Sequence, residues 1–196
     1  MTERTVRAFL GFDLPDEVRR TAAGLRTLVE DRRQAVRWVK GANIHLTLRF
    51  LGATPEQAVT EIAAALESEL TKFPALAVQV AATGVFPAAS RPSILWLGVA
   101  GQTRELQELE EIIHGVVGPM GFPREEREFS PHITIGRVRY PQKITPDVTN
   151  FLNAEYTPVE CPLQTLNLYE SRNVGGGVAY TPLAAMRLQS SDEEEK

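Results

Sequence analysis

The chain lacks most of the features that mark secreted, membrane or nucleic-acid-coating proteins. It contains one cysteine, Cys161, so no disulfide forms within it and a reducing compartment is expected. No run of about 18 apolar residues is present, and the first residues lack the apolar stretch of a signal peptide. The formal net charge is −4, so any nucleic-acid contact must be local. We expect a cytoplasmic monomer that binds no membrane.

Strand-like and helix-like segments alternate along the chain, and no compositional linker divides it. Runs rich in β-branched and aromatic residues predict strands over residues 5–12, 43–50, 76–80, 93–99, 129–138, 163–171 and 178–188. The glycines of 175–177 separate the last two strands and predict a hairpin connection. We expect one domain over residues 1–188, followed by a disordered acidic tail over 189–196.

Apolar residues at three- and four-residue spacing predict helices between the strands. One helix of about 15–18 residues is expected after Pro15, one begins at Pro55 with Thr54 as its cap, and one covers residues 103–117. A short helix is expected from Thr145. The helix predicted over residues 103–117 ends at Gly118, which is followed by Pro119.

Two of the predicted strands carry the same four-residue pattern. The pattern is histidine, apolar residue, threonine, apolar residue, and it occurs as HLTL at 45–48 and as HITI at 132–135. Only three histidines are present, so chance is a poor explanation for two of them sharing this pattern. Side chains alternate faces along a strand, so His45, Thr47 and Arg49 are expected on one face, with the leucines and Phe50 toward the core.

Two histidines that converge on one point suit acid–base chemistry at a phosphodiester. One imidazole takes a proton from the attacking oxygen and the other gives one to the leaving oxygen, near neutral pH. The hydroxyls of Thr47 and Thr134 can hydrogen-bond the phosphate oxygens that carry charge in the transition state.

A metal site is the main alternative use of paired histidines. Zinc requires a third protein ligand, and neither HExxH nor CxxC spacing supplies one nearby, so we expect no metal and no cofactor. A serine nucleophile has no support, because no GxSxG turn is present. His114 is placed with Glu110 and Glu111 on the solvent face of its helix.

Basic residues near the first motif are candidate RNA contacts. Arg37, Lys40 and Arg49 flank it, with Trp38 and Phe50 between them, although both rings are more typical of a core. Arg91, in the loop before the strand at 93–99, could reach the mouth of the same site.

The paired motifs resemble those of the two-histidine phosphoesterase superfamily, and within it the RNA 2′,3′-cyclic phosphodiesterases, historically called 2′-5′ RNA ligases. WVK before the first motif, RFLG after it, Ser-Pro before the second motif and Arg137 after it belong to the resemblance. It implies an α+β fold with two lobes. A pseudo-twofold pair of antiparallel-rich sheets, flanked by helices, would carry the two HxTx motifs in a central cleft.

The resemblance also implies an activity and residue roles. The enzyme would open the 2′,3′-cyclic phosphate of RNA ends to a 2′-phosphate without a metal, with weak reverse 2′-5′ ligation. His45 would be the proton donor and His132 the proton acceptor, while Thr47, Thr134 and Arg137 would bind phosphate. An ideal strand puts Arg137 on the wrong face, but a bulge at Gly136 would correct this.

Two alternatives remain open from the sequence. The same motif residues would serve a phosphodiesterase of small cyclic or 2′-5′-linked nucleotides, which needs no extended basic path. A non-catalytic RNA-end binding module would keep the site without turnover, but histidines are not required for binding alone.

Overall fold

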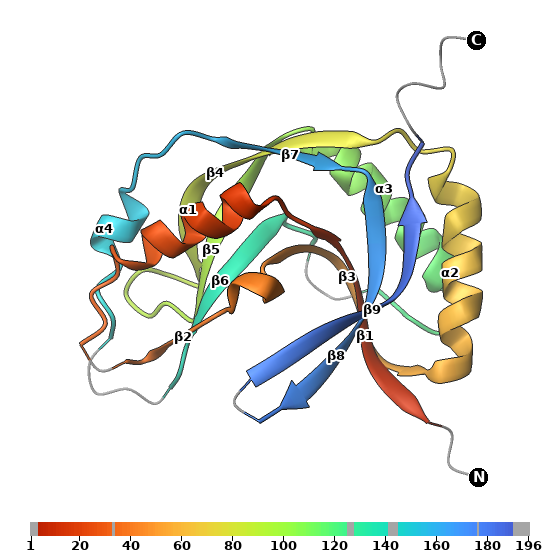
Figure 1. Ribbon diagram of the computed structural model, residues 1–196, viewed down its shortest axis with the longest axis horizontal. Coiled ribbons are helices and arrows are strands. Elements are labelled where there is room, and N and C mark those ends of the chain that lie inside the picture. The colour runs from red at the N-terminus through yellow and green to blue at the C-terminus, as the bar shows by residue number, and fades with distance from the viewer. Residues whose placement is uncertain (1–3, 33, 125–127, 141–144, 176, 190–196) are drawn as a thin grey trace.

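A computed structural model describes residues 4–32, 34–124, 128–140, 145–175 and 177–189. Residues 190–196 of the predicted tail lie outside this range. The described chain is an α+β fold with two antiparallel sheets, which confirms the predicted fold class (Figure 1).

The four-stranded sheet carries the first motif at one edge. Its order is β3–β1–β8–β9, and every neighbouring pair is antiparallel. The strands are β1 (Thr5–Asp13), β3 (His45–Pro55), β8 (Thr165–Val174) and β9 (Gly177–Arg187). The last two form the predicted hairpin.

The five-stranded sheet carries the second motif next to its edge. Its order is β2–β6–β5–β4–β7, again antiparallel throughout. The strands are β2 (Val36–Trp38), β4 (Leu76–Phe86), β5 (Ile94–Gly101), β6 (His132–Val138) and β7 (Val159–Leu163). Strand β3 contacts β6, so the two motif strands meet between the sheets (Figure 1).

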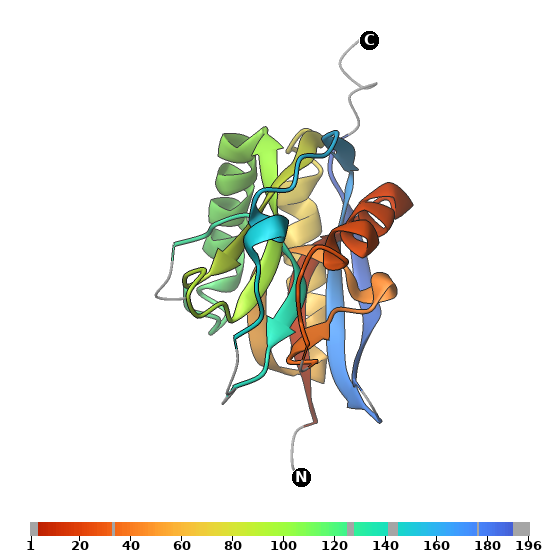
Figure 2. The same cartoon turned by 90° about the vertical axis from the view of Figure 1, so that its left-hand side faces the viewer.

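The helices are α1 (Asp16–Arg26), α2 (Glu56–Leu70), α3 (Thr103–Val117) and α4 (Thr149–Leu152), with a 3₁₀ turn η1 (Gly41–Asn43) before β3. Helix α3 agrees with its prediction, whereas α4 begins later than predicted. Helix α1 is shorter than expected. Helix α2 begins after Pro55 and lacks the predicted cap from the Thr54 side chain, because β3 extends to Pro55 and buries Thr54. Helices α2 and α3 pack together, and α1 lies apart from them (Figure 2).

One buried cluster of side chains joins both sheets to the helices. The stripe of α3 is fully buried, as its spacing predicted: Leu106, Leu109, Ile113 and Val117. From the motif strands, the apolar residues Leu46, Leu48, Ile133 and Ile135 enter the same cluster. Burial of these alternate residues fixes which face of each strand the histidines occupy.

Candidate active site

The first motif holds its histidine in one orientation. The Nδ1 atom of His45 lies 2.8 Å from the carbonyl oxygen of Asn43, and Nε2 lies 2.8 Å from the hydroxyl oxygen of Thr47. A carbonyl oxygen only accepts, so Nδ1 carries the proton and Nε2 of the neutral ring accepts from Thr47. The imidazole therefore presents Nε2 on the side of the threonine.

The second motif repeats the Nδ1 contact of the first. The Nδ1 atom of His132 lies 2.8 Å from the carbonyl oxygen of Ser130, which is again two residues before the histidine. The ring of Phe86 meets the His132 ring edge-on, with centroids 5.2 Å apart. Both motif histidines thus have the same tautomer, and in both Nε2 is the nitrogen left for proton transfer.

Each motif strand has a β-bulge directly after its threonine. In β3, Thr47 pairs with Gly11 and Arg49 with Leu10, so Leu48 is the extra residue. In β6, Thr134 pairs with Trp96 and Gly136 with Leu95, so Ile135 is the extra residue. A bulge reverses the alternation of side chains beyond it. The fifth residue after each histidine therefore returns to the histidine face.

The bulge predicted at Gly136 is present, and it turns Arg137 toward the first motif. Arg137 is exposed and pairs with Ile94 and Arg37 on the neighbouring strands. Burial is the main cause that lowers the pKa of His45, and the charge of Arg137 lowers it further; at Tyr180 on β9, burial raises the pKa and the charge of Arg137 partly opposes this. A cation from the five-stranded sheet thus acts on the histidine of the four-stranded sheet.

Aromatic rings pack around His45, and the burial of His45 lowers its pKa. The rings of Phe9 and Tyr180 lie 4.8 and 5.0 Å from it between centroids. Burial lowers the pKa of His45 below 6.5, and the Asn43 carbonyl and the Asp13 carboxylate partly oppose this. His45 is therefore neutral at pH 7 in the free protein.

Comparison with known proteins identifies this architecture. The model of the 2′-5′ RNA ligase superfamily matches residues 14–175. The chain belongs to this superfamily. The RNA 2′,3′-cyclic phosphodiesterase of Thermotoga maritima is 33% identical over 182 residues, which are 91% of this chain and 93% of the relative. The protein of the same name from Aquifex aeolicus is 30% identical, over 80% of this chain and 82% of its own.

Solved structures agree with the superfamily assignment. The protein TT0787 of Thermus thermophilus superposes with a TM-score of 0.77 at 25% identity, over 94% of this chain and 99% of that chain. E. coli LigT complexed with 3′-AMP gives a TM-score of 0.74 at 25% identity, with the same coverage.

In this superfamily member, Arg49 does not lie on the histidine face, so the sequence prediction for it is wrong. The bulge at Leu48 turns Arg49 inward opposite the fully buried Leu10, and only 4% of Arg49 is exposed. Its guanidinium lies 3.2 Å from a carboxylate oxygen of Glu110 and donates to the carbonyl oxygen of Pro123 at 2.6 Å. Arg49 is thus enclosed by protein and is not accessible to RNA.

The partners of Arg49 correct the prediction for α3. Glu110 is buried rather than solvated, and His114 lies 3.4 Å from the Arg49 guanidinium through Nδ1. Arg124 makes a second ion pair with Glu110 at 3.4 Å. This network joins β3 to α3 and to the segment after it, which leads toward the second motif.

Phe50 is exposed, although its position in an ideal strand predicts burial. Fifty-three per cent of it is accessible, and its ring lies 6.0 Å from that of Phe9. Phe9 pairs with Phe50 on one side and Tyr169 on the other, so these aromatic residues form a row across three strands. The row ends in solvent at Phe50, on the face of His45.

The remaining predicted RNA contacts lie on the surface. Lys40 is exposed just before η1. Arg91 is exposed in the β4–β5 loop, where its guanidinium lies 5.1 Å above the ring of Tyr140. Both residues stay predictions as RNA contacts.

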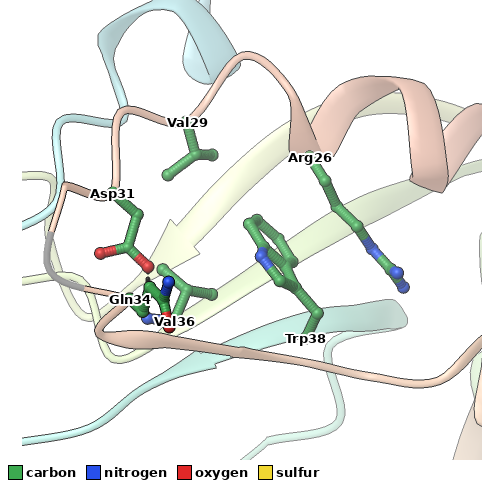
Figure 3. A pocket seen from close by; sticks show the side chains of 6 residues that line it. All are labelled: Arg26, Val29, Asp31, Gln34, Val36 and Trp38. Atoms are coloured by element: carbon green, nitrogen blue, oxygen red, sulfur yellow. Dashed lines mark hydrogen bonds between the residues drawn. The ribbon is translucent and has the colours of Figure 1, made fainter.

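A pocket on the other face of β2 is separate from the motifs. Figure 3 shows its lining residues: Arg26, Val29, Asp31, Gln34, Val36 and Trp38. Arg26 lies 5.5 Å over the Trp38 ring, and the Asp31 carboxylate accepts from the backbone N–H of Val36 at 2.7 Å. Trp38 pairs with Gly136, and a Cβ added at Gly136 would lie within 3.0 Å of the Trp38 ring. The Trp38 side chain therefore lies on the face of the sheet opposite to that of Arg137. The Arg26 guanidinium also donates to the carbonyl oxygen of Val39, so both charged residues of this pocket bond to the protein's own backbone.

Metal-binding clusters and membrane-spanning helices are both absent from the part of the chain that the structure describes. Within these ranges, no three histidine, cysteine or acidic side chains form a group that could hold a metal ion. Over the same residues, no helix has the length and apolar content needed to cross a membrane.

Proposed function

We propose that this protein hydrolyses the 2′,3′-cyclic phosphate at RNA 3′ ends and leaves a 2′-phosphate. The observation that carries the proposal is the repeated bond from Nδ1 of each motif histidine to the carbonyl oxygen two residues earlier. It orients two imidazoles alike and leaves Nε2 of each for proton transfer. The names of the Thermotoga maritima and Aquifex aeolicus relatives support this substrate.

In the proposed reaction the two histidines act on opposite sides of the phosphorus. Nε2 of His132 takes a proton from water as the water oxygen bonds to phosphorus. The bond from phosphorus to the 3′ oxygen breaks, and His45 gives its proton to that oxygen. Burial lowers the pKa of His45, so its protonated form requires the bound phosphate anion, which raises the pKa again.

The charge that develops on the phosphate oxygens is met by neutral and cationic donors. Thr47 lies against Nε2 of His45, and Thr134 has the equivalent position in the second motif. Arg137 adds a positive charge, which contributes to the lowered pKa of His45. A guanidinium can bind two phosphate oxygens at once, so we assign Arg137 to the non-bridging oxygens. These groups supply acid, base and charge stabilisation, and we propose that no metal takes part.

We further propose that the terminal base stacks on Phe50. Its ring is half accessible and lies on the face of His45, at the end of the row that contains Phe9. Every base has a π-face, so stacking there is independent of sequence. Phe50 thus replaces Arg49 as the proposed substrate contact after the first motif.

The test is an oligoribonucleotide that ends in a 2′,3′-cyclic phosphate, incubated with the protein and a chelator. Wild type is expected to open the ring to the 2′-phosphomonoester, and His45→Ala and His132→Ala each lose about 10²- to 10⁴-fold in rate. A cyclic end that wild type leaves intact, or that both variants open at the wild-type rate, overturns the proposal. Loss of wild-type activity in chelator overturns its metal-free part.

A further inference from the structure

Two arginines of the five-stranded sheet lie directly opposite each other beside the motifs. Arg37 on β2 pairs with Arg137 on β6, and side chains of directly paired residues share a face. Arg137 is on the histidine face, so Arg37 is as well. Both are exposed, and like charges placed opposite each other destabilise a sheet. Negative charge bound beside the two guanidinium groups would remove this cost.

Lys40, just before η1, is a third cation, and it lies near Arg37 where the β8–β9 hairpin approaches both. A Cβ built on Gly177 would lie 3.5 Å from the Arg37 guanidinium and 3.7 Å from Nζ of Lys40. The side chain of Asn43 donates to the carbonyl oxygen of Val178 at 2.6 Å, which ties the hairpin to the segment before the first motif. The side chains of Arg37 and Lys40 thus both lie close to the backbone of Gly177.

Acidic residues near the hairpin end do not neutralise these cations. Residues 173–180 contain no aspartate or glutamate, and Glu170 forms an ion pair with Arg172 at 3.2 Å. In a chain of net charge −4, this group of three neighbouring cations is a local exception. Such a patch selects a partner with several negative charges in a row.

We propose that Arg37 and Lys40 form a second anion subsite, which binds the phosphodiester on the 5′ side of the terminal nucleotide. This inference rests on the proposed function, in which Arg137 binds the reacting phosphate. Arg37 is its neighbour across the strand pair, so the two guanidinium groups meet consecutive phosphates of one strand. Contacts to phosphates position a strand without reading its sequence. The preferred substrate is therefore RNA with at least one internal phosphodiester, not a cyclic mononucleotide.

The test compares kcat/KM for a cyclic mononucleotide and for a dinucleotide with the same cyclic end. Wild type is expected to have the higher kcat/KM for the dinucleotide. Arg37→Gln lowers the ratio of kcat/KM for the dinucleotide to kcat/KM for the mononucleotide by about tenfold, which is the effect of one charge-assisted hydrogen bond. Lys40→Gln is expected to lower the ratio less. Replacement of the internal phosphate by a neutral methylphosphonate removes the wild-type preference and also the effect of Arg37→Gln.

The control is Arg104→Gln, which removes an exposed cation on α3 that pairs with Glu108, and it leaves the ratio unchanged. Equal rates on both substrates in wild type, or an unchanged ratio in Arg37→Gln, overturn the subsite while the proposed function stands. Failure to open either substrate overturns the proposed function itself. Melting temperatures of all variants confirm that the comparison is made on folded protein.

Discussion

Phe50 and Arg137 occupy equivalent positions in the two halves of the site. Each is the fifth residue after a motif histidine, and each follows a bulge in which an apolar residue, Leu48 or Ile135, is the extra one. Each is exposed on the histidine face. The four-stranded sheet thus offers a ring where the five-stranded sheet offers a cation, which suits a nucleotide with a base at one end and phosphate at the other.

The threonines give the first prediction. Thr47→Val and Thr134→Val are expected to lower kcat by about 10²-fold each, because each removes one donor to the charged transition state. Thr60→Val on α2 is the matched control and retains wild-type kcat. All of these measurements use the oligoribonucleotide with a cyclic end. Wild-type kcat in both motif variants would show that the hydroxyls take no part in the chemistry.

The titration of His45 gives the second prediction. NMR of the imidazole protons is expected to show a pKa of His45 below 6.5, and Arg137→Gln raises this pKa because Arg137 lowers it. The His45→Ala spectrum assigns the resonance. A pKa of His45 that does not move in Arg137→Gln would contradict the placement of Arg137 beside it.

The same shift makes stability depend on pH. The pKa of His45 is lower in the folded protein than in the unfolded chain, so the unfolded chain binds the proton more readily. The free energy of unfolding is therefore expected to fall as the pH drops from about 6.5 through the lower pKa of folded His45. Urea unfolding at several pH values measures this slope, and His45→Ala reduces it.

The buried ion pair gives the third prediction. Arg49→Met is expected to lower the free energy of unfolding by about 3–5 kcal/mol, because it leaves the Glu110 carboxylate buried without its closest cation. Arg49→Met combined with Glu110→Gln recovers part of this loss. Arg104→Gln, at an exposed ion pair, changes stability little. Urea unfolding at pH 7 compares them, and additive losses in the double variant would contradict the coupling.

The exposed ring gives the fourth prediction. Phe50→Ala is expected to lower kcat/KM for the cyclic-ended RNA by about tenfold or more, since one base loses its stacking partner. Phe50→Trp retains the activity and Phe50→Leu does not, because stacking needs a ring rather than apolar area. Stability changes little, as half of the side chain is already in water. Equal activity of the leucine and tryptophan variants would argue for simple packing instead.

Patterns within single segments predicted the motif strands and α3. They did not predict features that depend on how two strands pair. The stripe of α3 depends only on spacing within its own segment, and its bounds agree with the structure. A bulge depends on the register of two strands. Gly136 signalled the one before Arg137, but Leu48 looks like any core residue. Arg49 and Phe50 were therefore assigned to the wrong faces.

Arg37 shows the same limit at longer range. Its strand, β2, has only three residues and was not predicted, and its partner on β6 is a hundred positions away in the sequence. In the sequence, Arg37 is only one of three basic residues that flank the first motif. Its relation to Arg137 exists only in the folded sheet.

The pairing of β1 with β8 has a consequence for synthesis of the protein. β1 is made first, but its second neighbour begins at Thr165, so the sheet that holds His45 stays incomplete until β8 has left the ribosome. A truncated chain that ends before Thr165 contains both histidine motifs but lacks β8 and β9, which are half of the sheet that holds the first one. Activity should therefore appear late and all at once as the chain lengthens.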